Sequence, residues 1–289
     1  FEFLPIDVFK SDAEKYKIHS YSKENFVVAQ YRPFTKCTMY FDKVFNAMTY
    51  QVPKLFPTRD HKNLIITVPG LGGNKPFSCI VSNIIPDLNT LSAGTQCFPL
   101  YWYEEKDPRL TAMQLDLFGE DKDNGEKYIR HDGVTDFILG RARELYGNKV
   151  QKEDIFYYVY GFLHSAEYRQ TFEADLKKML PRIPLEEISA EDFWAFSKAG
   201  RALADLHLNY ETVEPYVAVH IDVKGKHFSS ITINEESPTY GRLVADGSAT
   251  YGEDKLFYVK QMKFPKKGEK STIIYNDRIT ISNIPEEAY

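Results

Sequence analysis

The hydrophobic positions between residues 154 and 210 repeat with the period of α-helices. From Ile155 to Leu163 the apolar side chains recur at spacings of three and four, which places them along one face of a helix. Asp154 stands at the expected N-cap position. The pattern therefore predicts an amphipathic helix packed by aromatic side chains, and the rest of the chain is expected to be built around it.

Two further helices follow in the same stretch. Ser165 interrupts the first pattern and is expected to cap a second helix, whose apolar face runs to Leu180 and ends before Pro181. Ser189 opens a sequence with the form of a capping box, and apolar positions then recur as far as Tyr210. A helical hairpin and a third helix are predicted.

On both sides of this region the hydrophobic period shortens to that of β-strands. Strands are predicted at residues 26–30, 38–41, 64–68, 79–85 and 95–105, and again at 216–223, 227–233, 256–264, 271–275 and 278–281. We predict an α+β fold in which antiparallel sheets at both ends flank a central helical bundle.

The same pattern divides the single region 1–289 into four parts. Residues 1–104 form a β-rich part, 105–133 a charged irregular excursion, 134–210 the helical core and 211–289 a second antiparallel β part. The core is expected to begin with a helix capped by Asp132.

Composition fits a folded protein: 43% of the 289 residues are hydrophobic and 27% are charged. The net charge of −5 argues against a protein that holds nucleic acid by its overall charge, although a local basic surface remains possible.

Cys37, Cys79 and Cys97 show no paired spacing, which fits the reducing cytoplasm and gives no zinc site. No apolar run is long enough to cross a membrane, and we expect a cytoplasmic piece of a longer polypeptide.

Two segments offer polar or cationic side chains that could bind a ligand such as a nucleic acid. The loop at residues 69–77 reads PGLGGNKPF, which is not a nucleotide-binding Walker pattern, but Asn74 and Lys75 are placed to reach a base or phosphate. Residues 260–270 contain five lysines. These lysines are expected either to contact phosphates or to form a solvated turn that protects an edge strand.

Catalytic patterns are weak or missing. The amino-methyltransferase motif [DNS]PP[YFW] does not occur. Asp222 and Lys224, with Asp205 upstream, imitate the D…(D/E)xK arrangement of metal-dependent nucleases. His207 and Glu211 lie one helical turn apart but lack a third metal ligand. We therefore predict no catalytic and no metal-binding residue in the chain.

Several blocks of sequence resemble one family. They are YRPF with MYFD at 31–42, TQCFPLYWYEE at 95–105, FYYVYGFLHSAEYR at 156–169, LPRIP at 180–184, GRALADLHLNYE at 200–211 and the final block at 273–289. Together these blocks resemble the carboxy-terminal target-recognition region of Type ISP restriction-modification enzymes. Thr35, Cys37 and Thr38 depart from the family, which commonly has basic residues there.

The resemblance implies a DNA sequence-recognition domain. Its partners would be double-stranded DNA and the methyltransferase and helicase parts of the same polypeptide. The parent would be a restriction endonuclease and adenine N6-methyltransferase that uses S-adenosylmethionine, ATP and Mg²⁺, none of them bound by this fragment.

Two alternatives stay open beside this interpretation: a (D/E)xK nuclease domain, and a coupling domain that does not touch DNA. The residues expected to contact DNA are Arg32, Lys36, Arg59, Asn74, Lys75, Lys260, Lys263, Lys266 and Lys267.

Overall fold

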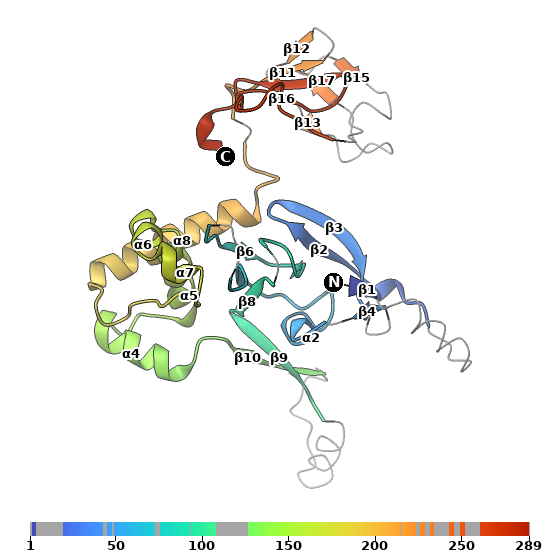
Figure 1. The fold of residues 1–289 in the computed structure, drawn as a ribbon. Coiled ribbons are helices and arrows are strands. Elements are labelled where there is room, and N and C mark those ends of the chain that lie inside the picture. Colours follow the sequence, from blue (N-terminus) through green and yellow to red (C-terminus); the bar gives the residue numbers. More distant parts are fainter. Residues whose placement is uncertain are drawn as a thin grey trace. The chain divides into compact units, whose positions relative to one another are not determined.

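The computed structural model describes residues 2–3, 20–42, 45–47, 49–72, 76–92, 94–107, 127–214, 216–223, 226–228, 232–233, 243–245, 249–251 and 261–288. The chain divides into two compact units, Phe1–Glu211 and Thr212–Tyr289. The fold is α+β with several small antiparallel sheets, as the sequence predicts (Figure 1).

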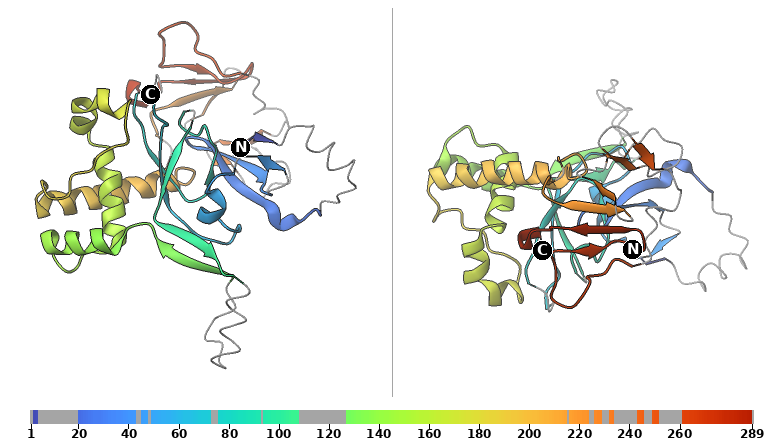
Figure 2. Two further views of the ribbon diagram at one scale, coloured as in Figure 1. Left: turned by 60° about the horizontal axis from the view of Figure 1, so that its bottom comes forward. Right: turned by 90° about the horizontal axis from the view of Figure 1, so that it is seen from above.

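Two helices form the centre of the first unit. The helices in this part are α4 (Asp136–Tyr146), α5 (Lys152–Leu163), α6 (Ala166–Thr171), α7 (Glu173–Leu176) and α8 (Ala190–Leu208). Figures 1 and 2 show α8 crossing α5. Ser165 and Ser189 cap α6 and α8 as predicted, each accepting a hydrogen bond from the backbone N–H three residues later.

Other helix boundaries differ from the prediction. Thr135, not Asp132, caps α4, and Gln151 caps α5, with Asp154 completing a capping box one turn later. The predicted second helix is wrong in length: it breaks at Phe172 into α6 and α7 and ends at Leu176. Thr and Asp are both good caps, so the sequence alone does not choose between Asp132 and Thr135. Glutamine is not a favoured cap, so the sequence points to Asp154 and not to Gln151.

A close approach of backbones fixes the crossing of α5 and α8. A Cβ atom on Gly161 would lie 2.2 Å from the carbonyl oxygen of Phe196, and one on Gly200 would lie 2.0 Å from the carbonyl oxygen of Tyr157. Only glycine fits at either position, because a real Cβ does not approach an oxygen that closely.

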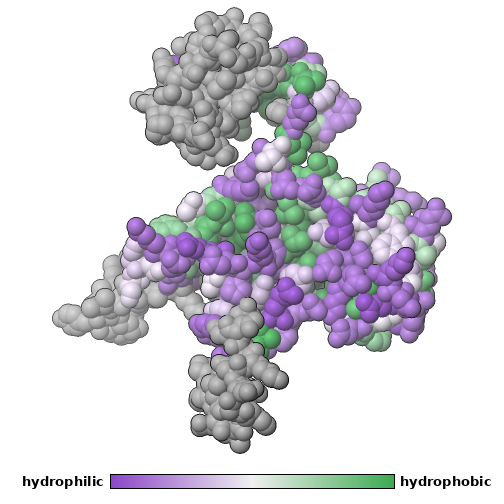
Figure 3. Space-filling model, turned by 180° about the vertical axis from the view of Figure 1, so that it is seen from behind, coloured by the Kyte–Doolittle hydropathy of each residue, from purple (hydrophilic) through white to green (hydrophobic). Residues whose placement is uncertain are grey.

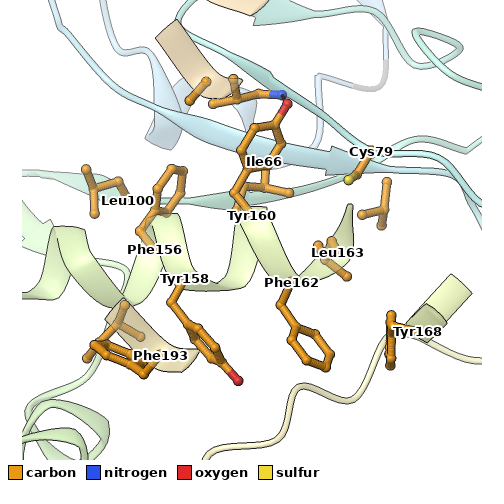
Figure 4. Close-up of a cluster of buried hydrophobic side chains, with 14 of the residues drawn as sticks. Ile66, Cys79, Leu100, Phe156, Tyr158, Tyr160, Phe162, Leu163, Tyr168 and Phe193 are labelled. Carbon is orange, nitrogen blue, oxygen red and sulfur yellow. Dashed lines mark hydrogen bonds between the residues drawn. The ribbon is translucent and has the colours of Figure 1, made fainter. Parts of the chain in front are cut away.

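The core of the first unit lies on two sides of α5. Figure 4 shows Phe156 and Tyr160 pointing from α5 toward the strands, and Tyr158 and Phe162 pointing to the opposite side. Tyr158, Tyr160 and Phe193 are almost completely buried. A helix that is apolar on more than one face is buried inside a domain, so α5 is the central element that the hydrophobic pattern predicts.

The first unit also contains short strands. They are β1 (Glu2–Phe3), β2 (Phe26–Arg32), β3 (Thr35–Tyr40), β4 (Asn46–Ala47), β5 (Ile65–Val68), β6 (Ile80–Ser82), β7 (Ile85–Pro86), β8 (Gln96–Pro99), β9 (Tyr101–Glu105) and β10 (Tyr128–Asp132). Of these, β5 and β6 pack against the core around α5, and β2 and β7 pack in a second cluster. The sheets have the orders β3-β2-β7, β6-β5-β8, β10-β9 and β1-β4, and all their pairs are antiparallel except β2 with β7. Two short helical elements, η1 (Lys23–Asn25) and α2 (Val52–Leu55), join them.

Several strand predictions are wrong in detail. Residues 79–85 form two strands, β6 and β7, which lie in different sheets. Of the predicted strand 256–264, residues 256–260 lie outside the described part of the chain, and 261–264 contain only the bridge between Lys263 and Ile274. Residues 95–105 do not form one strand, because the chain breaks at Leu100, whose N–H donates to Leu64 and whose carbonyl accepts from Gly133. Residues 128–132, placed in the irregular excursion, form β10 and pair with β9. Residues 108–126 of that excursion lie outside the described part of the chain.

The second unit is built from β-strands. They are β11 (His220–Val223), β12 (Lys226–Phe228), β13 (Thr232–Ile233), β14 (Leu243–Ala245), β15 (Ala249–Tyr251), β16 (Ile273–Ile274) and β17 (Ile279–Ser282), followed by the short helix η2 (Glu286–Ala288). Two antiparallel sheets result, with the orders β12-β11-β17-β16 and β13-β14-β15. Residues 227–233, predicted as one strand, contribute to both sheets.

Candidate nucleic-acid interface

Arg32 lies at the end of β2, where Pro33 and Phe34 turn the chain into β3. Its guanidinium group stacks over the ring of Tyr31, 4.0 Å from the centroid, and donates to Asp87 Oδ1 at 3.1 Å. The arginine side chain remains 41% exposed. Arg32 is therefore fixed in orientation and accessible, but a carboxylate already offsets its charge.

Lys36 follows on β3 and is also paired. Its Nζ lies 2.5 Å from Glu211 Oε2 and 5.2 Å from the centroid of the Tyr210 ring. This lysine joins the β2–β3 hairpin to the segment that follows α8. Glu211 is therefore engaged by Lys36, and His207 by the hydroxyl of Tyr160 at 2.5 Å, so the two do not form a metal site with each other.

Arg59 lies at the other end of the same hairpin. It pairs with Glu24 at 3.3 Å, just before the start of β2, and with Asp60 at 3.8 Å. Because each strand residue advances about 3.3 Å, the seven residues of β2 separate Arg59 from Arg32 by roughly 20 Å. The structure brings Arg32 and Lys36 onto one hairpin and leaves Arg59 apart.

The lysine-rich segment of the second unit is an exposed loop. The backbones of Lys263 and Ile274 exchange hydrogen bonds of 3.1 and 2.9 Å, which place the start of the loop beside the edge strand β16. Lys266 lies 3.7 Å from Glu269 Oε2. Within the described part of the chain no ion pair is found for Lys263 or Lys267. Among the predicted contacts that the structure describes, these two lysines have the least compensated charge.

Three predicted contacts, Asn74, Lys75 and Lys260, lie outside the described residues, as does Lys224 of the nuclease-like pattern. Asp205 accepts a hydrogen bond from Asn209 on the first unit, and Asp222 sits on β11 of the second. Within the described residues no three His, Cys, Asp or Glu side chains gather closely enough to hold a metal ion. The described residues thus give the nuclease alternative no support.

Sequence reasoning missed a polar network between α5 and the sheet. Arg169 donates to His164 Nδ1 at 3.1 Å and to the carbonyl of Leu163 at 2.6 Å. Since an arginine cannot accept, Nδ1 is the acceptor, so the imidazole proton is on Nε2 and points to Cys79 Sγ at 3.2 Å. Cys79 lies 85 positions from His164, which is why no sequence spacing reveals the pair.

The electrostatics of this network keep His164 and Cys79 neutral beside the charged Arg169. Burial, assisted by Arg169 and His207, lowers the pKa of His164 to about 4. Burial raises the pKa of the Cys79 thiol to about 11, although Arg169 opposes the change. A nucleophilic cysteine needs a thiolate at neutral pH, so the raised pKa of the Cys79 thiol does not favour a catalytic role for this cysteine and histidine.

No helix among the described residues is long and apolar enough to span a membrane.

Comparisons with known protein families and solved structures show what the whole chain is similar to. A model of the Type ISP C-terminal specificity domain matches residues 7–289. The chain is 29% identical, over 98% of its length and with a TM-score of 0.70, to the ATP-dependent Type ISP restriction-modification enzyme LlaBIII bound to DNA. It is 30% identical, over 97% of its length and with a TM-score of 0.65, to a nuclease-deletion mutant of the Type ISP enzyme LlaGI in complex with a DNA substrate mimic.

A third similar structure is the DrdV–DNA complex, 27% identical over 96% of this chain with a TM-score of 0.68. The chain spans only 15%, 20% and 23% of the lengths of these three proteins. No curated protein sequence matches it. The family model covers nearly all of the chain, and the resemblance in separate sequence blocks is confirmed: the chain belongs to the family of Type ISP C-terminal specificity domains.

Proposed function

We propose that this chain is the DNA sequence-recognition domain of a restriction-modification enzyme. In that role it directs site-specific adenine methylation and DNA cleavage carried out by other parts of the polypeptide. The family match over residues 7–289 carries the proposal. The likeness to three proteins whose structures contain DNA or a DNA mimic supports it.

The distribution of charge is consistent with this role. In a chain with a net charge of −5, sequence-independent attraction to DNA must come from local cations. Arg32, Lys36 and Arg59 are each paired with a carboxylate. The lysine loop of the second unit therefore contributes most to phosphate binding, and the paired cations of the first unit serve mainly to orient neighbouring elements.

The parent enzyme would supply the chemistry. S-adenosylmethionine, ATP and Mg²⁺ would be bound by its methyltransferase, helicase-like and nuclease parts, which lie outside this chain. Such enzymes act on DNA inside the cell, so we place the protein in the cytoplasm. This domain's own task is to bind double-stranded DNA and hold one sequence in register for its covalently attached partners.

A domain exchange tests the proposal. Residues 7–289 are replaced, in the full-length enzyme, by the matching domain of a relative that methylates a different sequence. The methylated adenine, mapped by sequencing that detects N6-methyladenine, is expected to move to the relative's site. A hybrid that remains active and still modifies the original site would contradict the proposal.

Removing the unpaired lysines of the loop is expected to weaken DNA binding at every sequence. Each phosphate that no longer meets a lysine should lower the slope of log K against log salt by about 1, so Lys263→Ala combined with Lys267→Ala should lower it by about 2. Fluorescence anisotropy at several salt concentrations measures the slope. Lys178→Ala, an exposed lysine of the first unit, is the control. An unchanged slope in the double variant would leave the loop as an edge-protecting turn.

The chain by itself is expected not to cut DNA. Incubation of the purified domain with plasmid and Mg²⁺ or Mn²⁺ should leave the plasmid supercoiled on a gel, because the Asp222 pattern gathers no metal site among the described residues. Cleavage that disappears in Asp222→Ala would establish the nuclease alternative. An electrophoretic mobility shift with the same DNA distinguishes a DNA-recognition domain from a coupling domain, because a coupling domain that does not touch DNA would give no shift.

A further inference from the structure

The β2–β3 hairpin is braced at its root by aromatic rings. The ring of Tyr40 lies 5.2 Å from that of Phe26 and 5.9 Å from that of Tyr21. The Tyr40 hydroxyl also accepts hydrogen bonds from the Ser22 backbone N–H at 3.0 Å and the Asn25 side chain at 3.2 Å. These contacts hold the two strands together at the root of the hairpin.

The tip of the hairpin is fixed as well. Phe34 packs edge-on against His207 and Tyr210, with ring centroids 5.5 and 5.2 Å away. The ion pairs Lys36–Glu211 and Arg32–Asp87 add polar contacts on the same end. A two-stranded hairpin held at both ends is a preorganised element, which loses little conformational entropy when it binds a partner.

Between these fixed ends lies an exposed, uncharged pair of side chains. Val28 and Thr38 are direct cross-strand partners, so they point to the same face. Val28 is 50% exposed and Thr38 is also exposed. Figure 3 shows that hydrophobic surface on the back of the first unit gathers in patches over its strand-containing half. Phe26, Val28 and Tyr31 are the exposed hydrophobic residues of β2.

The hairpin belongs to the three-stranded sheet β3-β2-β7, but its third strand is only two residues long. β7 pairs with β2 only at Ala29 and Gln30, and among the described residues no strand pairs with the outer edge of β3. Adjacent strands lie about 4.8 Å apart, and the major groove of B-DNA, about 12 Å wide, admits a two-stranded ribbon. Apart from the two residues that pair with β7, the hairpin is therefore a two-stranded ribbon of a width that this groove admits.

The hairpin carries no negative charge of its own and little uncompensated positive charge. Residues 26–41 contain Arg32 and Lys36 and no acidic residue, so no carboxylate of the hairpin itself would face phosphates. Both cations are paired with carboxylates of other segments. The hairpin thus lacks the excess charge of an element that binds DNA by attraction alone, and its exposed central pair offers a hydroxyl and methyl groups instead.

We propose that the β2–β3 hairpin enters the DNA major groove and that Val28 and Thr38 contact base edges there. The inference rests on the proposed function and assigns part of the sequence recognition to this pair. Methyl groups of valine and threonine match the C5-methyl of thymine, and the threonine hydroxyl can donate to or accept from any base edge.

Base analogues and side-chain swaps test the inference together in the full-length enzyme. The duplex carries the sequence that the enzyme methylates, with single positions replaced by deoxyuridine, which lacks the thymine methyl, or by 7-deazapurines, which lack N7. Both replacements alter only the major groove. The variants Val28→Thr and Thr38→Val keep the shape of exposed side chains, so both should fold normally, which the midpoint of thermal unfolding checks.

The wild-type enzyme should bind at least one analogue duplex roughly tenfold more weakly. Thr38→Val, which lacks the hydroxyl, should lose the sensitivity to a 7-deazapurine, and Val28→Thr, which keeps only one of the two methyl groups, should weaken the sensitivity to deoxyuridine. The salt slope should be unchanged in both variants. Thr171→Val, at an exposed position of α6, should keep the wild-type profile. Variants that keep the wild-type profile at every position would overturn the inference while leaving the proposed function intact. A wild-type enzyme that binds its methylated sequence no better than unrelated DNA would overturn both.

Discussion

Replacing Gly200 by alanine is expected to lower the free energy of unfolding by about 3 kcal/mol. The new Cβ would lie 2.0 Å from the carbonyl oxygen of Tyr157 and 2.7 Å from the backbone N of Gly161. Both are backbone atoms of α5, so no side chain can rotate away and the two helices must separate. Separation opens the core around Tyr158 and Phe193, where side chains would lose their packing on several sides at once.

Gly140 provides the matched control. It lies in α4, and an added Cβ would meet nothing within 4 Å. Gly140→Ala should therefore stabilise the protein by about 0.5 to 1 kcal/mol, because alanine has the higher helix propensity. Urea unfolding followed by circular dichroism measures both changes. Equal effects of the two substitutions would mean that the crossing of α5 and α8 tolerates separation.

The glycine contact illustrates what the sequence could and could not predict. The periodicity of apolar positions locates α5 and α8, because the packed face of a helix produces apolar residues three and four positions apart in the sequence. It does not reveal that Gly161 and Gly200 touch, since that contact joins residues from two different helices. The strands are less predictable for the same reason: β9 and β10 stabilise each other across the intervening excursion, and neither has a strong alternating pattern of its own.

The candidate interface shows the same limit. Counting lysines and arginines finds Arg32 and Lys36, but their carboxylate partners, Asp87 and Glu211, are 55 and 175 positions away. The sequence therefore predicts which residues carry positive charge and not how much of that charge is already compensated. For the lysine loop the sequence predicts the uncompensated charge correctly, because Lys263 and Lys267 have no ion-pair partner among the described residues.

Acidification from pH 7 to pH 4 should destabilise the protein partly through His164. Its pKa is about 4 in the folded protein, below the value of about 6.5 for an unfolded chain. A histidine with a lowered folded pKa contributes stability that is complete above pH 6.5 and declines as the pH falls toward 4. After allowance for solvent screening of this partly exposed ring, the contribution is about 1 to 2 kcal/mol.

The physical cause of this destabilisation lies in the hydrogen bonds of the ring. Arg169 donates to Nδ1, so a proton on that nitrogen would both remove the acceptor and place two positive charges side by side. His207, whose pKa is also lowered by burial, adds to the repulsion once it is charged. Cys79 and the buried hydroxyl of Tyr160 stay protonated throughout this range and supply no compensating anion.

His164→Gln separates this contribution from the titration of surface carboxylates. A glutamine amide can accept from Arg169 through its oxygen and donate to Cys79 through its nitrogen, but it does not titrate. Between pH 7 and pH 4 the variant should lose about 1 to 2 kcal/mol less stability than the wild type, measured by urea unfolding at each pH. If both proteins lost the same stability, protonation of His164 would not lower the free energy of unfolding. The network around Arg169 would then have to rearrange when His164 is protonated.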